Sequence, residues 1–278
     1  MTDRESDYVG RGTEEEVMRL ELQAAALSDI IDQEIDALDI RSGMSILDAG
    51  CGSGAITRRF ARKAHPAKVA GVDFDEIFLE YAKSIAEDEG INNVTYELGD
   101  IDNLAYPDDS FDLTYCRLVL MHVKDPVKTV KELKRLTRKG GVVAISDQDD
   151  DAVILYPYLP KMMDLWRRYG QWAKKMNMDR HIGKKLFSIL SQAGLKEIKI
   201  FLFSIYETQE TPEKLKMFVS VPVQIVKMSK EDLLTDGVFT EAEYYSALQE
   251  VESFENHPGA FVMSTFFLGV GYVPQEEE

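Results

Sequence analysis

The stretch "ILDAGCGSG", residues 46–54, constrains this chain most, because it places small residues directly after an apolar run. Three alternate glycines, Gly50, Gly52 and Gly54, follow one carboxylate, Asp48. Glycine weakens the interior of a strand, so this stretch predicts a turn that another group approaches closely. The free N–H groups of a helix that follows such a turn bind anions and nucleotides. The sequence therefore predicts a strand, a ligand-binding glycine turn and a helix.

Short runs rich in Val and Ile alternate with amphipathic segments over the next hundred or so residues. This alternation is typical of βαβ units, which build a parallel sheet with helices on both faces. A helical pattern also covers 13–38, where Thr13 and Glu16 are spaced as a capping box. The predicted strands are 45–49, 68–73, 94–98, 112–116 and 142–146, and the helices between them are 55–64, 75–89 and 126–137.

The rhythm changes after Ser146. An acidic run and an aromatic helical stretch fill 147–180, a helix and a strand cover 182–206, and 211–256 is mostly helical before a last strand. We expect an N-terminal lid helix over 1–40 and an α/β domain over 41–278. Helical insertions in that domain at about 148–180 and 207–257 would gather with the lid helix over one edge of the sheet.

Composition narrows the classes of partner. The chain has 32 basic and 49 acidic residues, a net charge of -17. Such a chain repels phosphate backbones and anionic lipids, so neither nucleic acid nor a membrane surface is an expected partner. The two cysteines, Cys51 and Cys116, form no CxxC or Cys/His cluster, so the sequence supports neither a disulfide framework nor a structural zinc site. The N-terminus shows no signal-peptide pattern and no apolar run is long enough to span a membrane, which predicts a cytoplasmic protein.

Two cofactor classes compete for the glycine turn. The dinucleotide fingerprint G-x-G-x-x-G/A fits Gly50, Gly52 and Ala55, with Asp73 at a suitable distance. That match favours a nicotinamide-dependent dehydrogenase. It gives no role to Gly54, which completes D-x-G-x-G-x-G, or to Asp100 at the end of the third predicted strand.

The segments "ILDAGCGSG", "VAGVDFD", "LGDIDNLAYPDDSFDLTYC" and "LKRLTRKGGVVAIS" occur in this order. With them the chain resembles the class I S-adenosylmethionine-dependent methyltransferases, strongly over 44–148 and in pattern over 182–273. The resemblance implies a Rossmann-like, seven-stranded αβα sandwich whose sheet is mostly parallel with an antiparallel last strand, and a helical lid. It also implies transfer of a methyl group from S-adenosyl-L-methionine to N, O or C of a small-molecule acceptor.

The resemblance implies a set of cofactor contacts. Asp48 would support the loop and help to hold the ammonium group of the cofactor. Asp73 would accept hydrogen bonds from both ribose hydroxyls, and Asp100 would accept one from the adenine amino group. The other implied contacts are Gly50, Cys51, Gly52 and Gly54 under the methionyl part, Phe74 and Ile101 beside the adenine, and Arg117 and Leu118 near the methionine end and the transferring methyl.

Residues near the methyl acceptor are less clearly indicated. His122, in "CRLVLMHVKDP", is a candidate general base, and Arg117 is a second catalytic candidate. The alternative for His122 is a structural hydrogen bond beside Asp125, which we expect to cap the following helix. The N-terminal "YVGRGTEEEVMRLELQ" resembles the lid of small-molecule methyltransferases, in which Tyr8 and Arg11 would fold over the cofactor.

Four aspartates, 147 and 149–151, follow the fifth predicted strand. Asp147 and Asp149 would be the inner pair of a site for an amine or another cationic acceptor. A divalent metal is a second interpretation, as in the catechol-type branch, although that branch has a carboxylate where this chain has Cys116 and Arg117. A solvated loop is the third. Further candidates for the acceptor pocket are Trp166, Tyr169, Arg180 and His181.

Three alternatives to a small-molecule methyltransferase stay open. A protein or RNA methyltransferase is disfavoured by the acidic charge and by the lack of an N/D-P-P-Y/F motif after the fourth strand. A nicotinamide dehydrogenase would leave Gly54 and Asp100 without a role. A non-catalytic regulatory module would bind the cofactor and turn nothing over. The sequence predicts no oligomeric state.

Overall fold

The computed structural model describes residues 13–275, except the side chain of Glu15, and the chain forms two compact units. Among the described residues, one unit, here called the sheet unit, comprises 13–148, 182–203 and 266–275. The other, the helical unit, includes Asp149–His181 and Ser204–Thr265.

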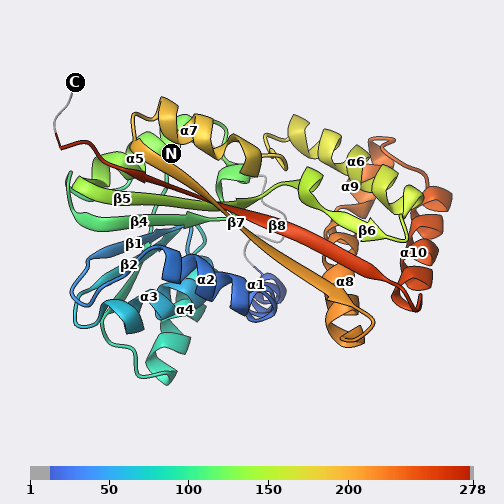
Figure 1. The fold of residues 1–278 in the computed structure, drawn as a ribbon, viewed down its shortest axis with the longest axis horizontal. Coiled ribbons are helices and arrows are strands. Elements are labelled where there is room, and N and C mark those ends of the chain that lie inside the picture. The colour runs from blue at the N-terminus through green and yellow to red at the C-terminus, as the bar shows by residue number, and fades with distance from the viewer. Residues whose placement is uncertain (1–12, 276–278) are drawn as a thin grey trace. The chain divides into compact units, whose positions relative to one another are not determined.

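The sheet unit holds strands in the order β3-β2-β1-β4-β5-β8, with β7 beside β8 (Figure 1). Strands β1 to β5 pair in parallel, and β8 runs antiparallel to β5. The order reverses next to β1, and ligands bind at the carboxyl ends of strands at such a switch point. The elements are α1 (Glu14–Ala26), α2 (Ser28–Ala37), β1 (Ile46–Ala49), α3 (Ala55–Ala64), β2 (Val69–Asp73), α4 (Glu76–Asp88), β3 (Val94–Leu98), β4 (Phe111–Arg117), η1 (Leu120–His122), α5 (Pro126–Leu136), β5 (Thr137–Gln148), η3 (Gly183–Lys185), α7 (Leu186–Gln192), β7 (Lys196–Thr208) and β8 (Phe261–Tyr272), the last two of which also contribute residues to the helical unit.

Helices cover both faces of this sheet, as its apolar strands require. On one face, Leu47 of β1 belongs to a buried cluster with Leu133 of α5 and Leu186 of α7. On the other face, Phe60 of α3 meets Tyr115 of β4 edge to face, with ring centroids 5.0 Å apart. The site-bearing ends of the strands are thus set by a core on each side of the sheet.

The helical unit has a core of its own. Buried side chains of α6, α8 and α10 form one apolar cluster, which includes Leu165, Leu215 and Val251. Glu250 of α10 accepts hydrogen bonds from two backbone N–H groups in the first turn of α6, at 2.9 Å each. The elements are η2 (Asp150–Ala152), β6 (Ile154–Tyr156), α6 (Pro160–Lys175), α8 (Pro212–Met228), α9 (Lys230–Thr235) and α10 (Glu241–Glu255), and β6 pairs antiparallel with the start of β8.

The predicted fold class, an α/β sheet that is mostly parallel with an antiparallel strand at its end, is confirmed. Two details differ. The sheet of the described residues has eight strands rather than seven, because the three-residue β6 is too short to show an alternation of apolar and polar residues. The helix predicted over 13–38 is two helices that break at Leu27, because apolar periodicity continues across the break.

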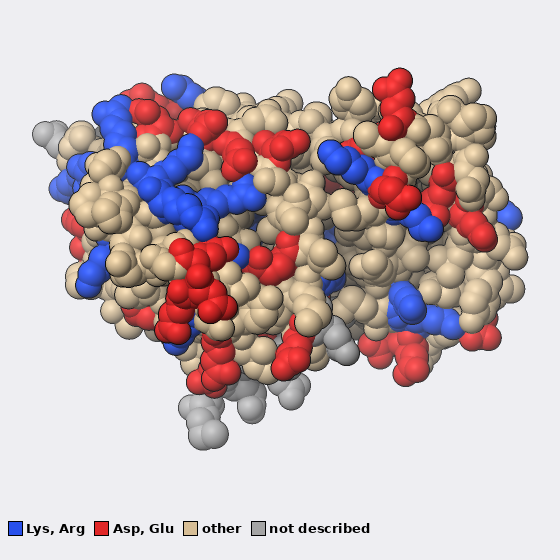
Figure 2. Space-filling model, turned by 90° about the horizontal axis from the view of Figure 1, so that it is seen from below, with Lys and Arg blue, Asp and Glu red and all other residues tan. Residues whose placement is uncertain are grey.

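Charge is mixed over the face of the molecule drawn in Figure 2, where basic side chains lie beside acidic ones. Within residues 13–275, no helix combines the length and the apolar character needed to cross a bilayer.

Candidate active site

The glycine loop after β1 is folded back onto the end of β2. The backbone N–H groups of Gly50 and Cys51 both donate to the carbonyl oxygen of Val72, at 2.8 and 3.0 Å. The N–H of Gly52 donates to Oδ2 of Asp73 at 2.8 Å. The loop is therefore fixed by the neighbouring strand, and Asp73 is part of the same hydrogen-bonded structure.

Gly50, Gly52 and Gly54 all have positive φ angles, at 77°, 53° and 76°. L-residues rarely adopt this backbone conformation. A Cβ at Gly50 would overlap the side chain of Val119, and a Cβ at Gly54 would lie 2.5 Å from Oη of Tyr96. Backbone and packing together require glycine at the first and third positions.

Asp48 is buried at the end of β1, 2% exposed, and its Oδ2 accepts a hydrogen bond from the hydroxyl of Thr57 on α3 at 2.6 Å. Burial raises the pKa of Asp48 to about 7, and the charge of Asp73 adds to this rise. The Thr57 bond and the charge of Arg117 act in the opposite direction. Asp48 thus ties β1 to α3 beside the glycine loop.

Asp73 ends β2 and is also buried. Its two carboxylate oxygens accept backbone N–H groups of Gly52, at 2.8 Å, and of Asp75, at 3.1 Å, and the backbone N–H of Phe74 also interacts with the carboxylate. Burial raises its pKa to about 6, although these hydrogen bonds act to lower it. A carboxylate has about four acceptor positions, so Asp73 retains capacity for at least one further donor.

Asp100 lies close to Asp73 along the edge of the sheet, because the N–H of Gly99 donates to the carbonyl oxygen of Asp73 at 2.9 Å. The side chain of Asp100 accepts from the N–H of Asp102 at 3.0 Å. Phe74 is 37% exposed, and Ile101 packs partly buried against the core. The structure therefore brings the predicted ribose and adenine residues to neighbouring strand ends.

The free thiols of Cys51 and Cys116 have raised pKa values, with burial as the largest cause and nearby carboxylates as the next. Both thiols are therefore protonated at neutral pH, and neither is set up as a nucleophile.

Arg117 has a buried partner that sequence reasoning missed. Glu34 of α2 is fully buried and accepts three hydrogen bonds, from Tyr115 Oη at 2.8 Å, Arg117 Nε at 3.0 Å and Ser146 Oγ at 2.8 Å. A signal was present, because Glu34 has helical spacing from Ile30, Ile31 and Leu38 and so falls on the apolar face of its helix.

His122 ends the short helix η1, which follows β4 closely, and it is partly buried. Asp125 caps α5 as expected, accepting from the N–H of Lys128 at 3.0 Å. Asp147 of β5 is fully buried and accepts from the N–H groups of Met121 at 3.4 Å and Gln148 at 3.0 Å. Asp147 therefore holds the turn of chain that carries His122.

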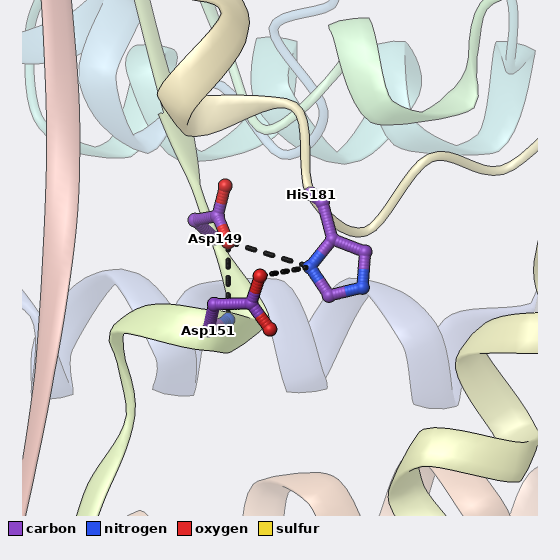
Figure 3. A group of neighbouring side chains, drawn as sticks. All are labelled: Asp149, Asp151 and His181. Atoms are coloured by element: carbon purple, nitrogen blue, oxygen red, sulfur yellow. Dashed lines mark hydrogen bonds and ion pairs between the residues drawn. The ribbon is translucent and has the colours of Figure 1, made fainter.

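In the helical unit, Asp149 and Asp151 lie beside His181 (Figure 3). Nδ1 of His181 is 3.3 Å from Asp149 Oδ1 and 3.6 Å from Asp151 Oδ2. Carboxylate oxygens and an imidazole nitrogen so close together could ligate a divalent cation. Asp149 also caps η2 through the N–H of Asp151 at 3.0 Å, so hydrogen bonding accounts for this arrangement as well. The aspartate run is thus divided between the units, with Asp147 in the sheet unit.

Arg180 and Trp166 also belong to the helical unit. Arg180 forms a two-point ion pair with Asp150, at 2.7 and 3.0 Å, and its guanidinium lies over the ring of Trp166, 4.5 Å from the centroid. Tyr169 packs against the same guanidinium at 5.8 Å. Tyr8 and Arg11 lie outside the described residues.

A family model described as a methyltransferase domain matches residues 40–194, which is more than half of the 278 residues. The chain belongs to this family. The resemblance to class I S-adenosylmethionine-dependent methyltransferases is thereby confirmed at the level of family and fold. The matched residues include the glycine loop, Asp73, Asp100, Arg117 and His122.

Individual relatives match over part of the chain or with low identity. An uncharacterized methyltransferase of Schizosaccharomyces pombe is 37% identical over 118 residues, which are 40% of this chain and 42% of that protein. The chain thus spans less than half the length of this curated relative. The crystal structure of the YcgJ protein of Bacillus subtilis has a TM-score of 0.58 at 18% identity, covering 91% of this chain and 99% of that chain.

Phosphoethanolamine N-methyltransferase 2 of Haemonchus contortus, solved with phosphomonomethylethanolamine and S-adenosylhomocysteine, has a TM-score of 0.56 at 18% identity, covering 89% of this chain and 53% of that one. At 18% identity, the similarity of this chain to the Bacillus subtilis and Haemonchus contortus structures shows a shared fold and no more.

Proposed function

We propose that this chain transfers a methyl group from S-adenosyl-L-methionine to N, O or C of a small-molecule acceptor. The observation that carries the proposal is the glycine loop closed on Asp73. The family places this loop in a methyltransferase domain, and Asp73 offers two buried acceptor oxygens beside it.

The residues present fit this cofactor. The carboxylate of Asp73 has acceptor capacity for the ribose hydroxyls, which can share its oxygens with the backbone donors, and Asp100 on the neighbouring strand end has capacity for the adenine amino group. Phe74 and Ile101 offer apolar surface for the adenine ring. The Haemonchus contortus relative was solved with S-adenosylhomocysteine, which supports the same cofactor here.

When bound, the cofactor supplies a methyl group on a positively charged sulfur. An electron pair of the acceptor atom would form the new bond to the methyl carbon, and the electrons of the carbon–sulfur bond would remain on sulfur. Any proton that the acceptor atom loses must pass to a base, and we assign that role to the imidazole of His122. The remaining task of the protein is to align the reacting groups, which is the larger part of catalysis for a displacement of this kind.

A small-molecule acceptor is supported by charge and by analogy. A net charge of -17 disfavours nucleic acid as the substrate. The Haemonchus contortus protein was solved with phosphomonomethylethanolamine, a small molecule. The methylated atom and the identity of the acceptor are the objects of the experiment that follows.

The test incubates the protein with S-adenosyl-L-methionine and a panel of small amines, phenols and carboxylic acids, and measures release of S-adenosylhomocysteine. We expect turnover with at least one acceptor class, and His122→Ala to lower it by about tenfold or more at unchanged cofactor affinity. Tight cofactor binding without turnover over a broad panel would support the regulatory module instead.

A further inference from the structure

The buried carboxylate of Glu34 organises one end of β4. It accepts from Arg117, Tyr115 and Ser146, which lie on β4 and β5. A buried charge is costly unless it is paired and hydrogen-bonded, and Glu34 meets both conditions. The main consequence is for Arg117, whose Nε is held in one position.

These contacts leave part of the hydrogen-bonding capacity of the Arg117 guanidinium unsatisfied. Its side chain is 7% exposed, and its guanidinium lies over the ring of Phe266, 5.0 Å from the centroid. Its Nη2 is buried and has no hydrogen-bond partner among the residues that the structure describes. Leaving a charged donor buried and unsatisfied is unfavourable, and the planar guanidinium matches the geometry of a carboxylate or a phosphate.

The position of Arg117 indicates which anionic group its Nη2 would bind. β4 pairs directly with β1, where Tyr115 stands opposite Asp48. Two residues beyond Arg117, the side chain of Val119 packs against Gly50 of the glycine loop. Arg117 therefore lies in the segment that borders the loop to which the methionyl part of the cofactor is assigned.

We propose that Glu34 positions Arg117 so that Nη2 donates a hydrogen bond to the α-carboxylate of the methionyl part of the cofactor. This inference rests on the proposed function. Arg117 is then a binding residue for a carboxylate, and Glu34 is a positioning residue that never touches the ligand. The carboxylate of a methyl acceptor is the other possible source of this group, and the test separates the two.

The test is calorimetric titration with two ligands. One is S-adenosylhomocysteine, and the other is S-adenosyl-3-thiopropylamine, which lacks only the carboxylate. We expect Arg117→Met to weaken binding of S-adenosylhomocysteine by about tenfold to a hundredfold, the range for one charged hydrogen bond. Binding of the carboxylate-free ligand should change by less than about threefold, which also shows that the variant is folded.

Two further variants test the positioning role. Glu34→Gln keeps a side chain that can hydrogen-bond Tyr115 and Ser146 but removes the charge that holds Arg117. It should reduce the preference for the carboxylate ligand by at least about threefold. Tyr115→Phe removes a different hydrogen bond to Glu34 and is the matched control, whose preference should stay within about twofold of the wild-type value. Arg117→Lys, which keeps a charge beside Glu34, replaces Arg117→Met if that variant does not fold.

The outcomes are distinct. If the Arg117 variant binds both ligands more weakly by the same factor, or keeps the wild-type ratio of the two affinities, the inference is overturned and the proposed function stands. An unchanged preference together with a raised KM for acceptors that carry a carboxylate would assign Arg117 to the acceptor and would also overturn it. A wild-type protein that binds neither ligand would instead refute the proposed cofactor.

Discussion

Gly54 is held to one residue type by two independent constraints. Its φ of 76° lies in the left-handed region, and the hydroxyl of Tyr96 occupies the space where a Cβ would stand. A motif match detects the first constraint, because glycine is what such turns require. The second constraint is the contact with Tyr96 of β3, about forty residues along the chain, and only the structure reveals it.

A pair of glycine variants separates these constraints. Gly90 also has a positive φ, at 69°, but nothing lies within 4 Å of its Cβ position. We expect Gly90→Ala to lower the free energy of unfolding by about 1–2 kcal/mol, the cost of the left-handed conformation. Gly54→Ala should cost about 1–3 kcal/mol more, because Tyr96 must move. Urea denaturation measures both, and equal losses would show that Tyr96 imposes no constraint.

Asp73 is the residue on which cofactor recognition should depend most. Asp73→Ala removes two charge-assisted hydrogen bonds and should weaken binding of S-adenosylhomocysteine by about 2–3 kcal/mol. Asp75→Ala is the control, because Asp75 caps α4 through the N–H of Ile77 at 3.0 Å. That variant should lose about 1 kcal/mol of stability with little change in affinity. Unchanged affinity in Asp73→Ala would refute the ribose assignment.

Asp48 should make stability depend on pH. Its pKa is raised to about 7 in the folded protein, above the ordinary value of 3.8. The folded state therefore binds this proton more tightly, and the stability that it contributes is lost as pH rises from about 4 through about 7. Asp48→Asn removes this dependence and can still hydrogen-bond Thr57.

Relative to wild type, the Asp48→Asn variant should thus gain about 2–4 kcal/mol in unfolding free energy between about pH 4 and pH 8. Urea denaturation at a series of pH values gives this difference. A difference that stays constant over the range would mean that Asp48 is ionised in the folded state throughout.

At the scale of elements, one buried arginine joins three helices around the glycine loop. Arg58 of α3 donates to the carbonyl oxygen of Ser53 at 2.8 Å. It also pairs with Glu21 of α1 at 3.0 Å and with Glu89, which ends α4, at 3.1 Å. Arg59, one residue on, is 24% exposed; it pairs with the exposed Asp32 at 2.7 Å and donates to Ser28 Oγ at 3.0 Å.

These neighbours provide a matched comparison. Arg58→Met should lower the free energy of unfolding by at least about 2 kcal/mol, because it leaves the loop carbonyl of Ser53 and the carboxylate of Glu21 without this buried donor, whereas Glu89 keeps its pair with Arg62. Arg59→Met should cost less than about 1 kcal/mol, as expected for a solvent-exposed pair. Differential scanning calorimetry of the two variants tests this, and similar losses would argue against a clamp at Arg58.

The elements also show what the pattern of residues could predict. The strand–helix alternation up to Ser146 was predictable, because buried parallel strands and amphipathic helices leave distinct periodicities. The break at Leu27 was not, since α1 and α2 both turn apolar residues inward and the periodicity runs through it. Glu34 was overlooked for a related reason. A carboxylate on an apolar face has meaning only when its partners on β4 and β5 are known.

At the scale of the whole molecule, the residues proposed for the cofactor were easier to predict from the sequence than those proposed for the acceptor. The residues proposed to bind the cofactor lie in one family domain, and the geometry of its glycine loop is set by the backbone, which a sequence motif specifies well. The residues proposed for the acceptor, in contrast, are brought together by tertiary contacts. Arg180, for example, pairs with Asp150, thirty residues away, and stacks on Trp166. No spacing rule predicts such a grouping.

The central claim is that the glycine loop, together with Asp73 and Asp100, binds S-adenosyl-L-methionine and not a dinucleotide. The most direct measurement is parallel calorimetric titration of the wild-type protein with S-adenosyl-L-methionine, S-adenosylhomocysteine and NADH. We predict dissociation constants in the micromolar range for the first two ligands and no heat of binding for NADH. Binding of NADH alone would contradict this account and would assign the loop to a nicotinamide dehydrogenase.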